Sequence, residues 1–183
     1  MRKFSAALLF LTSMGCAGSS VAAHVMVGGQ AMFASQDIVA NAANSADHST
    51  LVAAVKAAGL VATLKGKGPY TLFAPTNAAF AKLPPGTVET LLKPENKKAL
   101  VKLLSYHVVA GKFDFDALAA RMKKEGGKAT LPTLAGGHLT VAMNGKHNMT
   151  ITDDGGNVAD ISIYDVDQSN GMIHVVDSVL MPD

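Results

Sequence analysis

The chain is predicted to fold as an α+β domain, because helical patterns fill its first part and strand patterns fill its last third. Apolar residues recur at helical spacing in several segments between Ile38 and Leu104. From His138 onward apolar and polar residues alternate, and Asn144-Gly145 is a strong hairpin signal. We find no internal repeat and no low-complexity segment in the 183 residues.

Capping residues and breakers delimit the helices of the first part. Asp37 can cap the first helix, Ser49 or Thr50 can start the second, and Thr76 can cap a short third helix. The expected order is a helix from Ile38 through Ala42, a helix from 49 that stops at Gly59, a turn at 66–69, a buried strand at 70–73 halted by Pro75, a short helix after Thr76, a short helix at 87–92, a helix opened by Pro94 that carries Leu100 to Leu104, a strand at 106–109, and a helix at 113–125.

The last third is expected to contain antiparallel strands joined by tight turns. The strands are placed at 138–143, 146–152, 158–164 and 172–180, with turns at Asn144-Gly145 and at 153–157. The block Met172-Ile-His-Val-Val is nearly continuously apolar, as expected of a buried strand.

The first 23 residues have the three parts of a secretory signal peptide. Met1-Arg2-Lys3 is basic, an apolar run extends from Phe4 to about Met14, and Val21-Ala22-Ala23 ends in small residues. The run is shorter than the roughly 20 residues of a membrane-spanning helix, which disfavours an uncleaved anchor. We expect cleavage near Ala23 and export to the periplasm or medium; acylation at Cys16 is an alternative, disfavoured by the absence of the usual upstream leucine.

Removal of residues 1–23 from the 183-residue chain leaves 160 residues, which suits one domain. We expect an extended N-terminal arm at 24–34 and a folded domain at 35–182. The remaining chain has no cysteine, and its 14 basic residues balance its 14 acidic ones. Its single arginine and zero net charge argue against nucleic-acid binding.

Three blocks resemble the signature of the fasciclin domain family. They are Tyr70-Thr-Leu-Phe-Ala-Pro-Thr-Asn-Ala-Ala-Phe80, the pair Tyr106-His107, and Asn170-Gly-Met-Ile-His-Val-Val-Asp177. The similarity extends from about Ser35 to Pro182, and Met26-Val-Gly-Gly-Gln-Ala-Met32 resembles the leader of secreted bacterial members. The resemblance implies a wedge of two β-sheets flanked by several short helices. It also implies a non-enzymatic role in adhesion or matrix contact, without a cofactor.

Most residues of the two longer blocks are interpreted as structural. Pro75 and Thr76 together make a sharp strand-to-helix corner, and Gly171 supplies backbone freedom before the last strand. The structural set comprises Thr71, Pro75, Thr76, Asn77, Phe80, Asn170, Gly171 and His174.

Tyr106 and His107 have two interpretations. In the family, the region around the Tyr-His pair is linked to receptor binding, which makes these residues a candidate contact site. Alternatively, Tyr106 packs in the core and His107 hydrogen-bonds across a strand-helix junction, since a buried His or Tyr needs a partner. We favour the structural interpretation because no carboxylate stands next to His107 in the local sequence.

The residues also bear on two other classes of function, enzymes and metal-binding proteins. A hydrolytic triad needs an exposed nucleophile turn, and the chain has no G-x-S-x-G elbow, so we expect no enzyme activity. Copper binding is the alternative function, because imidazole and thioether ligands suit copper. Its candidate ligands are His24, Met26, Met143, His147 and Met149.

The sequence therefore predicts an exported, non-enzymatic adhesion or binding module. It would contact a protein or glycan on a surface, matrix, biofilm or host, and it could associate with itself.

Overall fold

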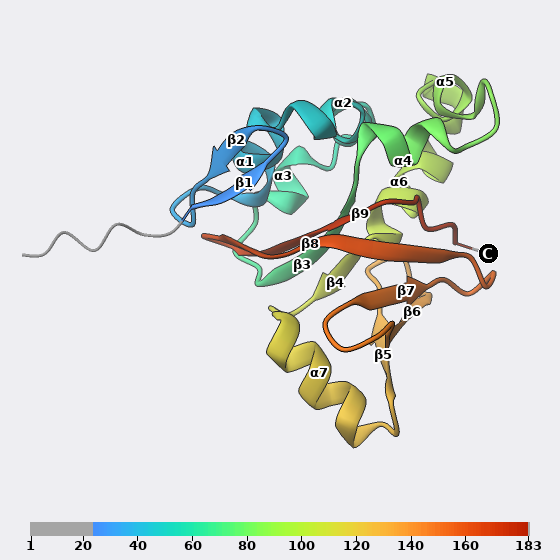
Figure 1. Ribbon diagram of the computed structural model, residues 1–183. Helices are drawn as coiled ribbons and strands as arrows, with labels where there is room; N and C mark the ends of the chain where they lie inside the picture. The colour runs from blue at the N-terminus through green and yellow to red at the C-terminus, as the bar shows by residue number, and fades with distance from the viewer. Residues whose placement is uncertain (1–23, 183) are drawn as a thin grey trace, which may run out of the picture.

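The computed structural model describes residues 24–182, and the expected signal peptide with Cys16 lies outside them. Its strands form a seven-stranded sheet in the order β4-β3-β9-β8-β7-β6-β5 and a separate two-stranded sheet, β1-β2 (Figure 1). The strands are β1 Val25–Val27, β2 Gln30–Met32, β3 Tyr70–Pro75, β4 Val108–Ala110, β5 Lys128–Pro132, β6 His138–Met143, β7 Met149–Thr152, β8 Val158–Gln168 and β9 Gly171–Val176. Short helices flank both sheets, so the predicted α+β class is confirmed.

The helices are short, and three begin at a side chain that caps the backbone. Asp37, Thr76 and Asp114 accept hydrogen bonds from Ala40 N, Ala79 N and Ala117 N, as N-cap residues do. The helices are α1 Ile38–Asn44, α2 Ser49–Ala58, α3 Val61–Leu64, α4 Asn77–Ala81, α5 Thr87–Leu91, α6 Lys97–Tyr106 and α7 Phe115–Lys124, with 3₁₀ turns η1 Ala46–His48 and η2 Pro94–Asn96.

Strands β3 and β9 lie in the middle of the large sheet and run parallel, with Tyr70 opposite Gly171 and Pro75 opposite Val176. Every residue of β9 is buried, as is all of β3 after Tyr70. This explains their near-continuous apolar sequence, since a parallel pair is covered on both faces. Alternate residues therefore serve two separate apolar clusters.

The first cluster contains Leu72 and Ile173 and lies under the helices α1, α2 and α6. The second contains Phe73 and Val176 and lies among β5–β8 and α7. The strands β3 and β9 thus separate two apolar cores. Side chains from one face of the pair are buried in the first core, and side chains from the other face are buried in the second.

The large sheet curls until its two edges meet. Val109 of β4 pairs with Thr133 just after β5, and Leu134 N donates to Val108 O at 2.8 Å. Strand β8 supplies part of the bend, because its pairing with β9 shifts register on both sides of Ile163. Asp165 in the same strand has φ 56°, the only positive φ of a non-glycine residue among residues 24–182.

Several segments differ from the sequence predictions: helix α3 was not predicted, and the strand predicted at 172–180 ends at Val176. Strand β5 was not expected, and Tyr106 was expected in a strand but ends helix α6. Residues 24–34, expected as an extended arm, contain the β1-β2 hairpin, whose Val27 and Met32 are only 4% and 5% exposed. The hairpin therefore packs on the domain and shares in its first apolar cluster.

Gly171 provides a test of the central strand pair. A Cβ atom at this position would overlap the carbonyl oxygen of Tyr70 on β3. We expect Gly171→Ala to lower the free energy of unfolding by about 3 kcal/mol, because the strands must separate to relieve the overlap. Urea unfolding of the purified protein measures this.

Gly127→Ala is the control, since Gly127 has φ 104° but no atom within 4 Å of an added Cβ. It should lose about 1–2 kcal/mol through backbone strain alone. Equal losses in the two variants would contradict the close β3-β9 approach.

Candidate functional site

Tyr106 and His107, the candidate contact residues, lie at the junction of α6 and β4. Tyr106 ends the helix and His107 follows as its C-terminal cap. Their side chains are 0% and 1% exposed, respectively. Neither side chain reaches the surface in the folded domain, so a partner could touch them only if the fold opened.

Each ring nitrogen of His107 has a backbone partner. Leu180 N donates to Nε2 at 3.1 Å, so Nδ1 carries the proton and donates to Leu103 O at 2.9 Å. The His107 carbonyl accepts a bond from Phe73 N at 2.9 Å. His107 therefore joins α6, β3 and the C-terminal segment after β9.

Burial lowers the pKa of His107 to about 4, against the opposing effects of the Leu103 carbonyl and the nearby Asp153 charge. The imidazole is consequently neutral at neutral pH. This is the state that its two hydrogen bonds require, because Nε2 must keep a free electron pair to accept from Leu180 N.

Tyr106 makes a similar connection through its hydroxyl. The hydroxyl donates to His138 O at 2.7 Å and accepts from Asp154 N at 2.9 Å. Burial is the main cause that raises the pKa of Tyr106, to about 12. Gly137 lies flat against the ring, where an added Cβ would come within 2.7 Å of Cε2. The side chain ties α6 to the turns beside β6 and β7.

Thr71 and His174 connect the central strands to the segment before α7. Thr71 Oγ1 donates to Gly111 O at 2.8 Å and accepts from Phe113 N at 2.9 Å. His174 Nε2 lies 2.7 Å from Phe113 O, and its Nδ1 accepts from Asp165 N at 3.3 Å. Burial lowers the pKa of His174, which is therefore also neutral at neutral pH.

Two asparagines of the recognised blocks are hydrogen-bond hubs. Asn170 accepts from Ile38 N at 3.1 Å and donates to Leu64 O and Gly66 O at 2.7 and 3.0 Å. Asn77 accepts from Thr50 N and donates to Ala46 O, both at 2.9 Å. The first connects β9 to α1 and α3, and the second fixes the start of α2.

The remaining members of the structural set lie at the end of β3 and in α4. Pro75 ends β3, Thr76 caps α4, and Phe80 is 5% exposed in the first apolar cluster. The eight residues predicted as structural thus line the central strands and the segments attached to them. Their predicted structural role is consistent with this placement.

His48 is a buried polar residue that sequence reasoning missed. It is 2% exposed, and its Nδ1 lies 2.8 Å from Ser45 Oγ. Its Nε2 has no hydrogen-bond partner among residues 24–182. The ring borders a cavity of about 10 Å³ under Val27 and Met32, which is the space of one water molecule at most.

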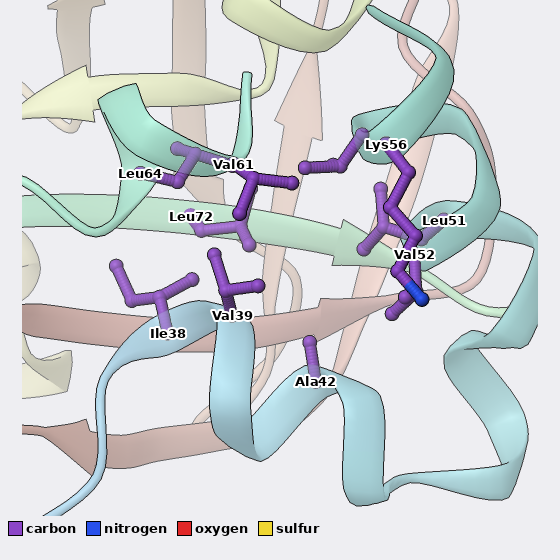
Figure 2. Close-up of a pocket in the computed structure, with 10 residues that line it drawn as sticks. Ile38, Val39, Ala42, Leu51, Val52, Lys56, Val61, Leu64 and Leu72 are labelled. Carbon is purple, nitrogen blue, oxygen red and sulfur yellow. The ribbon is translucent and has the colours of Figure 1, made fainter. Parts of the chain in front are cut away.

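An apolar cleft lies between α1, α2, α3 and β3 (Figure 2). Its lining comprises Ile38, Val39, Ala42, Leu51, Val52, Val55, Lys56, Val61, Leu64 and Leu72. Lys56 is the only charged residue among them, and the cleft encloses only about 20 Å³. Ligand pockets are usually at least ten times larger, so the cleft as it stands is a packing gap.

The candidate copper ligands fall into two separate places. His24 and Met26 lie at the β1-β2 hairpin, whereas Met143, His147 and Met149 belong to the β6-β7 hairpin at the other end of the molecule (Figure 1). Met149 is 0% exposed in the second apolar cluster, while Met143 is 40% exposed. The structure does not bring the five together, and the copper hypothesis stays a prediction.

Comparison with known proteins agrees with this geometry. The family model of the fasciclin domain matches residues 46–182. The chain is 50% identical to protein sll1483 of Synechocystis, over 79% of this chain and 73% of that protein. It is 34% identical to the cell surface glycolipoprotein MPB83 of Mycobacterium bovis, over 94% of this chain and 72% of that protein.

Among solved structures, a FAS1 domain pair from the insect cell adhesion molecule fasciclin I has the same fold. The TM-score is 0.71 at 18% sequence identity, covering 80% of this chain and 51% of that one. The fold and its buried motifs therefore define an α+β domain with internal hydrogen-bond hubs. The chain belongs to the fasciclin domain family.

Two findings concern sites that the described part of the chain could offer. Within residues 24–182, no three His, Cys, Asp or Glu side chains are grouped so as to hold a metal ion together. Over the same residues, no helix is both long and apolar enough to cross a membrane.

The neutral state of His107 predicts a loss of stability in mild acid. The unfolded chain, with a His pKa near 6.5, binds this proton before the folded one does, whose pKa is about 4. Stability from this residue is therefore complete above pH ~6.5 and declines by about 3 kcal/mol as the pH falls toward ~4. Urea unfolding over this pH range measures the loss.

His107→Gln is the informative variant for this prediction, because its side chain stays neutral throughout. It should show a smaller decline in unfolding free energy between those pH values, with the part due to His48 and His174 remaining. Superimposable pH profiles for the two proteins would show that His107 does not titrate on unfolding.

Proposed function

We propose that this protein is an exported, non-enzymatic binding module that mediates adhesion to a surface, matrix or host. The observation that carries the proposal is the fasciclin match over residues 46–182. The cell-surface location in the name of the mycobacterial relative supports export, and the insect neighbour is described as a cell adhesion molecule. Export in turn agrees with the signal-peptide pattern of residues 1–23.

The burial of the Tyr-His pair supports different roles for the buried and the exposed residues of this domain. Tyr106 and His107 hold helices, strands and turns together by four side-chain hydrogen bonds to the backbone. We assign them to the scaffold, and we assign the adhesive contact to exposed side chains elsewhere on the domain.

Lipid attachment is the alternative mode of export for the same function. Cys16 would carry the lipid, and the mycobacterial relative is named a glycolipoprotein. Mass spectrometry of the protein recovered from its native host distinguishes the two. A chain that begins at His24 supports cleavage near Ala23, and an acylated N-terminal Cys16 supports lipid attachment.

Attachment assays test the adhesion proposal directly. Deletion of the gene should reduce attachment of the cells to surfaces, to matrix or to a host, and the full-length gene should restore it. Unchanged attachment in all three settings would contradict the proposed function.

His107→Ala distinguishes the scaffold role from a contact role. As a scaffold residue, its loss should cost about 1–3 kcal/mol of unfolding free energy, because Leu180 N and Leu103 O lose their partner. Adhesion should then fall only in proportion to the folded fraction. A variant with an unchanged melting temperature and strongly reduced adhesion would contradict the scaffold role.

A further inference from the structure

The charges of the mature chain are strongly separated along its length. Residues 48–112 contain nine lysines and two glutamates, whereas residues 24–47 and 113–183 contain five basic and twelve acidic residues. The zero net charge of the mature chain therefore conceals a segment of +7 and a remainder of −7. The positive segment is the one that forms α2 to α6.

Five of these lysines lie on or directly beside α2, α3 and α6. A methyl group at Gly59, which ends α2, would lie 3.5 Å from Lys97 Nζ, so the start of α6 borders the end of α2. Lys56 of α2 lines the apolar cleft, and its side chain extends past Val52 (Figure 2). We call this surface the basic face, and its members are Lys56, Lys65, Lys93, Lys97 and Lys98.

The basic face is not neutralised by the protein's own carboxylates. All five lysines are exposed. The ion pairs found within residues 24–182 are Lys82–Asp177, Lys112–Asp167 and Arg121–Glu125, and none includes a lysine of this face. Five exposed lysines on or beside α2, α3 and the start of α6 therefore take part in none of these ion pairs.

Lys97 and Lys98 occupy an electrostatically unfavourable position. They form the first turn of α6, which contains no acidic residue. The helix N-terminus is its positive end, where a cation costs about 0.3–1 kcal/mol and an anion is favoured. Two lysines at this end do not help α6 to form, but they add to its attraction for an external anion.

The same two lysines border a hollow of about 600 Å³. Its other lining residues are Pro94, Glu95 and Val101. The two apolar side chains offer a surface for the C–H faces of a sugar ring, and Glu95 offers an acceptor for hydroxyl groups. The hollow is large enough for a sugar unit, whereas the apolar cleft is not.

The carboxylates of this chain are poorly suited to act as the partner in a second copy. Asp37 and Asp114 cap helices, Asp153 and Asp165 accept backbone N–H groups, and Asp167 and Asp177 already have lysine partners. The negative remainder of the chain thus uses much of its charge internally.

We infer that the basic face binds an acidic polysaccharide, with one carboxylated or sulfated sugar in the hollow at the start of α6. The inference rests on the proposed adhesive function and names the chemistry of its partner. Lysine suits this ligand, because a flexible point charge can follow irregularly spaced anions, while arginine forks favour fixed phosphate geometry. The large exposed apolar side chains found within residues 24–182 all lie off this face, which therefore lacks the stacking platforms of single-strand nucleic-acid sites.

Calorimetric titration with alginate, a polyuronate, tests the inference on protein purified after expression of the full chain. The neutral polymer dextran and double-stranded DNA are titrated alongside it. We expect alginate to bind, with an affinity that weakens as salt is added, and to bind more tightly than either control polymer. The double variant K97Q/K98Q should reduce alginate affinity about tenfold, since two of the five charges are removed.

The matched control is K123Q/K124Q, which removes two exposed consecutive lysines from the last turn of α7. It makes the same change in net charge but should keep the wild-type affinity. The unfolding free energies should move in opposite directions, because cations are disfavoured at the start of α6 and favoured at the end of α7. K97Q/K98Q should therefore be as stable as the wild type or slightly more so.

Three results would overturn the inference: no binding of alginate by the wild type, equal losses in the two double variants, or tighter binding of DNA than of alginate. The outcome is separable from that of the adhesion assay. Selective alginate binding with unchanged attachment of the deletion strain would refute the adhesive function and keep the binding site. Lost attachment without alginate binding would support the adhesive function and refute the binding site.

Discussion

The parallel pairing of β3 with β9 is the constraint on which most of the structure depends. It joins residues 70–75 to residues 171–176, which are far apart in the sequence. Both apolar clusters pack on this pair, one on each face. Residues that link other segments to this pair lie at its ends. Asn170 precedes β9, and Thr76 follows β3. His107 accepts a hydrogen bond from the backbone amide of Leu180, just beyond β9. The two longer signature blocks are the two strands of this pair with their attached corners.

Local signals in the sequence were sufficient for much of the fold. Asp37 and Thr76 act as the predicted N-caps, and the pattern around Asn144-Gly145 does form a hairpin between β6 and β7. Strand β5 was missed for a physical reason. It begins with Lys128-Ala129 and ends at Pro132, so β-branched and aromatic residues are scarce in it. Its antiparallel pairing with β6 over its whole length defines it, and Arg121 and Glu125 add bonds to Thr130 O and Thr130 N.

The candidate site was predictable in part. A buried role for Tyr106 and His107 followed from the need of such side chains for partners, although Tyr106 was placed in one strand with Val108 and Val109. The three long-range bonds of Asn170 left no local signal, because their partners are backbone groups distant in sequence. His48 bonds to the nearby Ser45 side chain, but its burial depends on tertiary packing that no local pattern indicates. The charge separation was concealed by the zero net charge of the mature chain, and only the fold shows that Lys97 lies next to the end of α2.

The division between scaffold and surface follows from these contacts. The recognisable residues are mostly internal, so they preserve a shape that can be kept while the exposed side chains change. The lysines around α6 show how such a surface can acquire a charge of its own without any change in the buried hubs. Function in this domain is consequently expected to depend on residues that no signature block contains.

Amide hydrogen exchange measured by NMR tests the central claim most directly. If the β3-β9 pair is the element on which the rest depends, its amides and the Leu180 amide should exchange most slowly, and only through global unfolding. Their free energies of exchange should then equal the unfolding free energy from urea. Faster exchange at β3, β9 and Leu180 than at the β6-β7 hairpin would contradict the account.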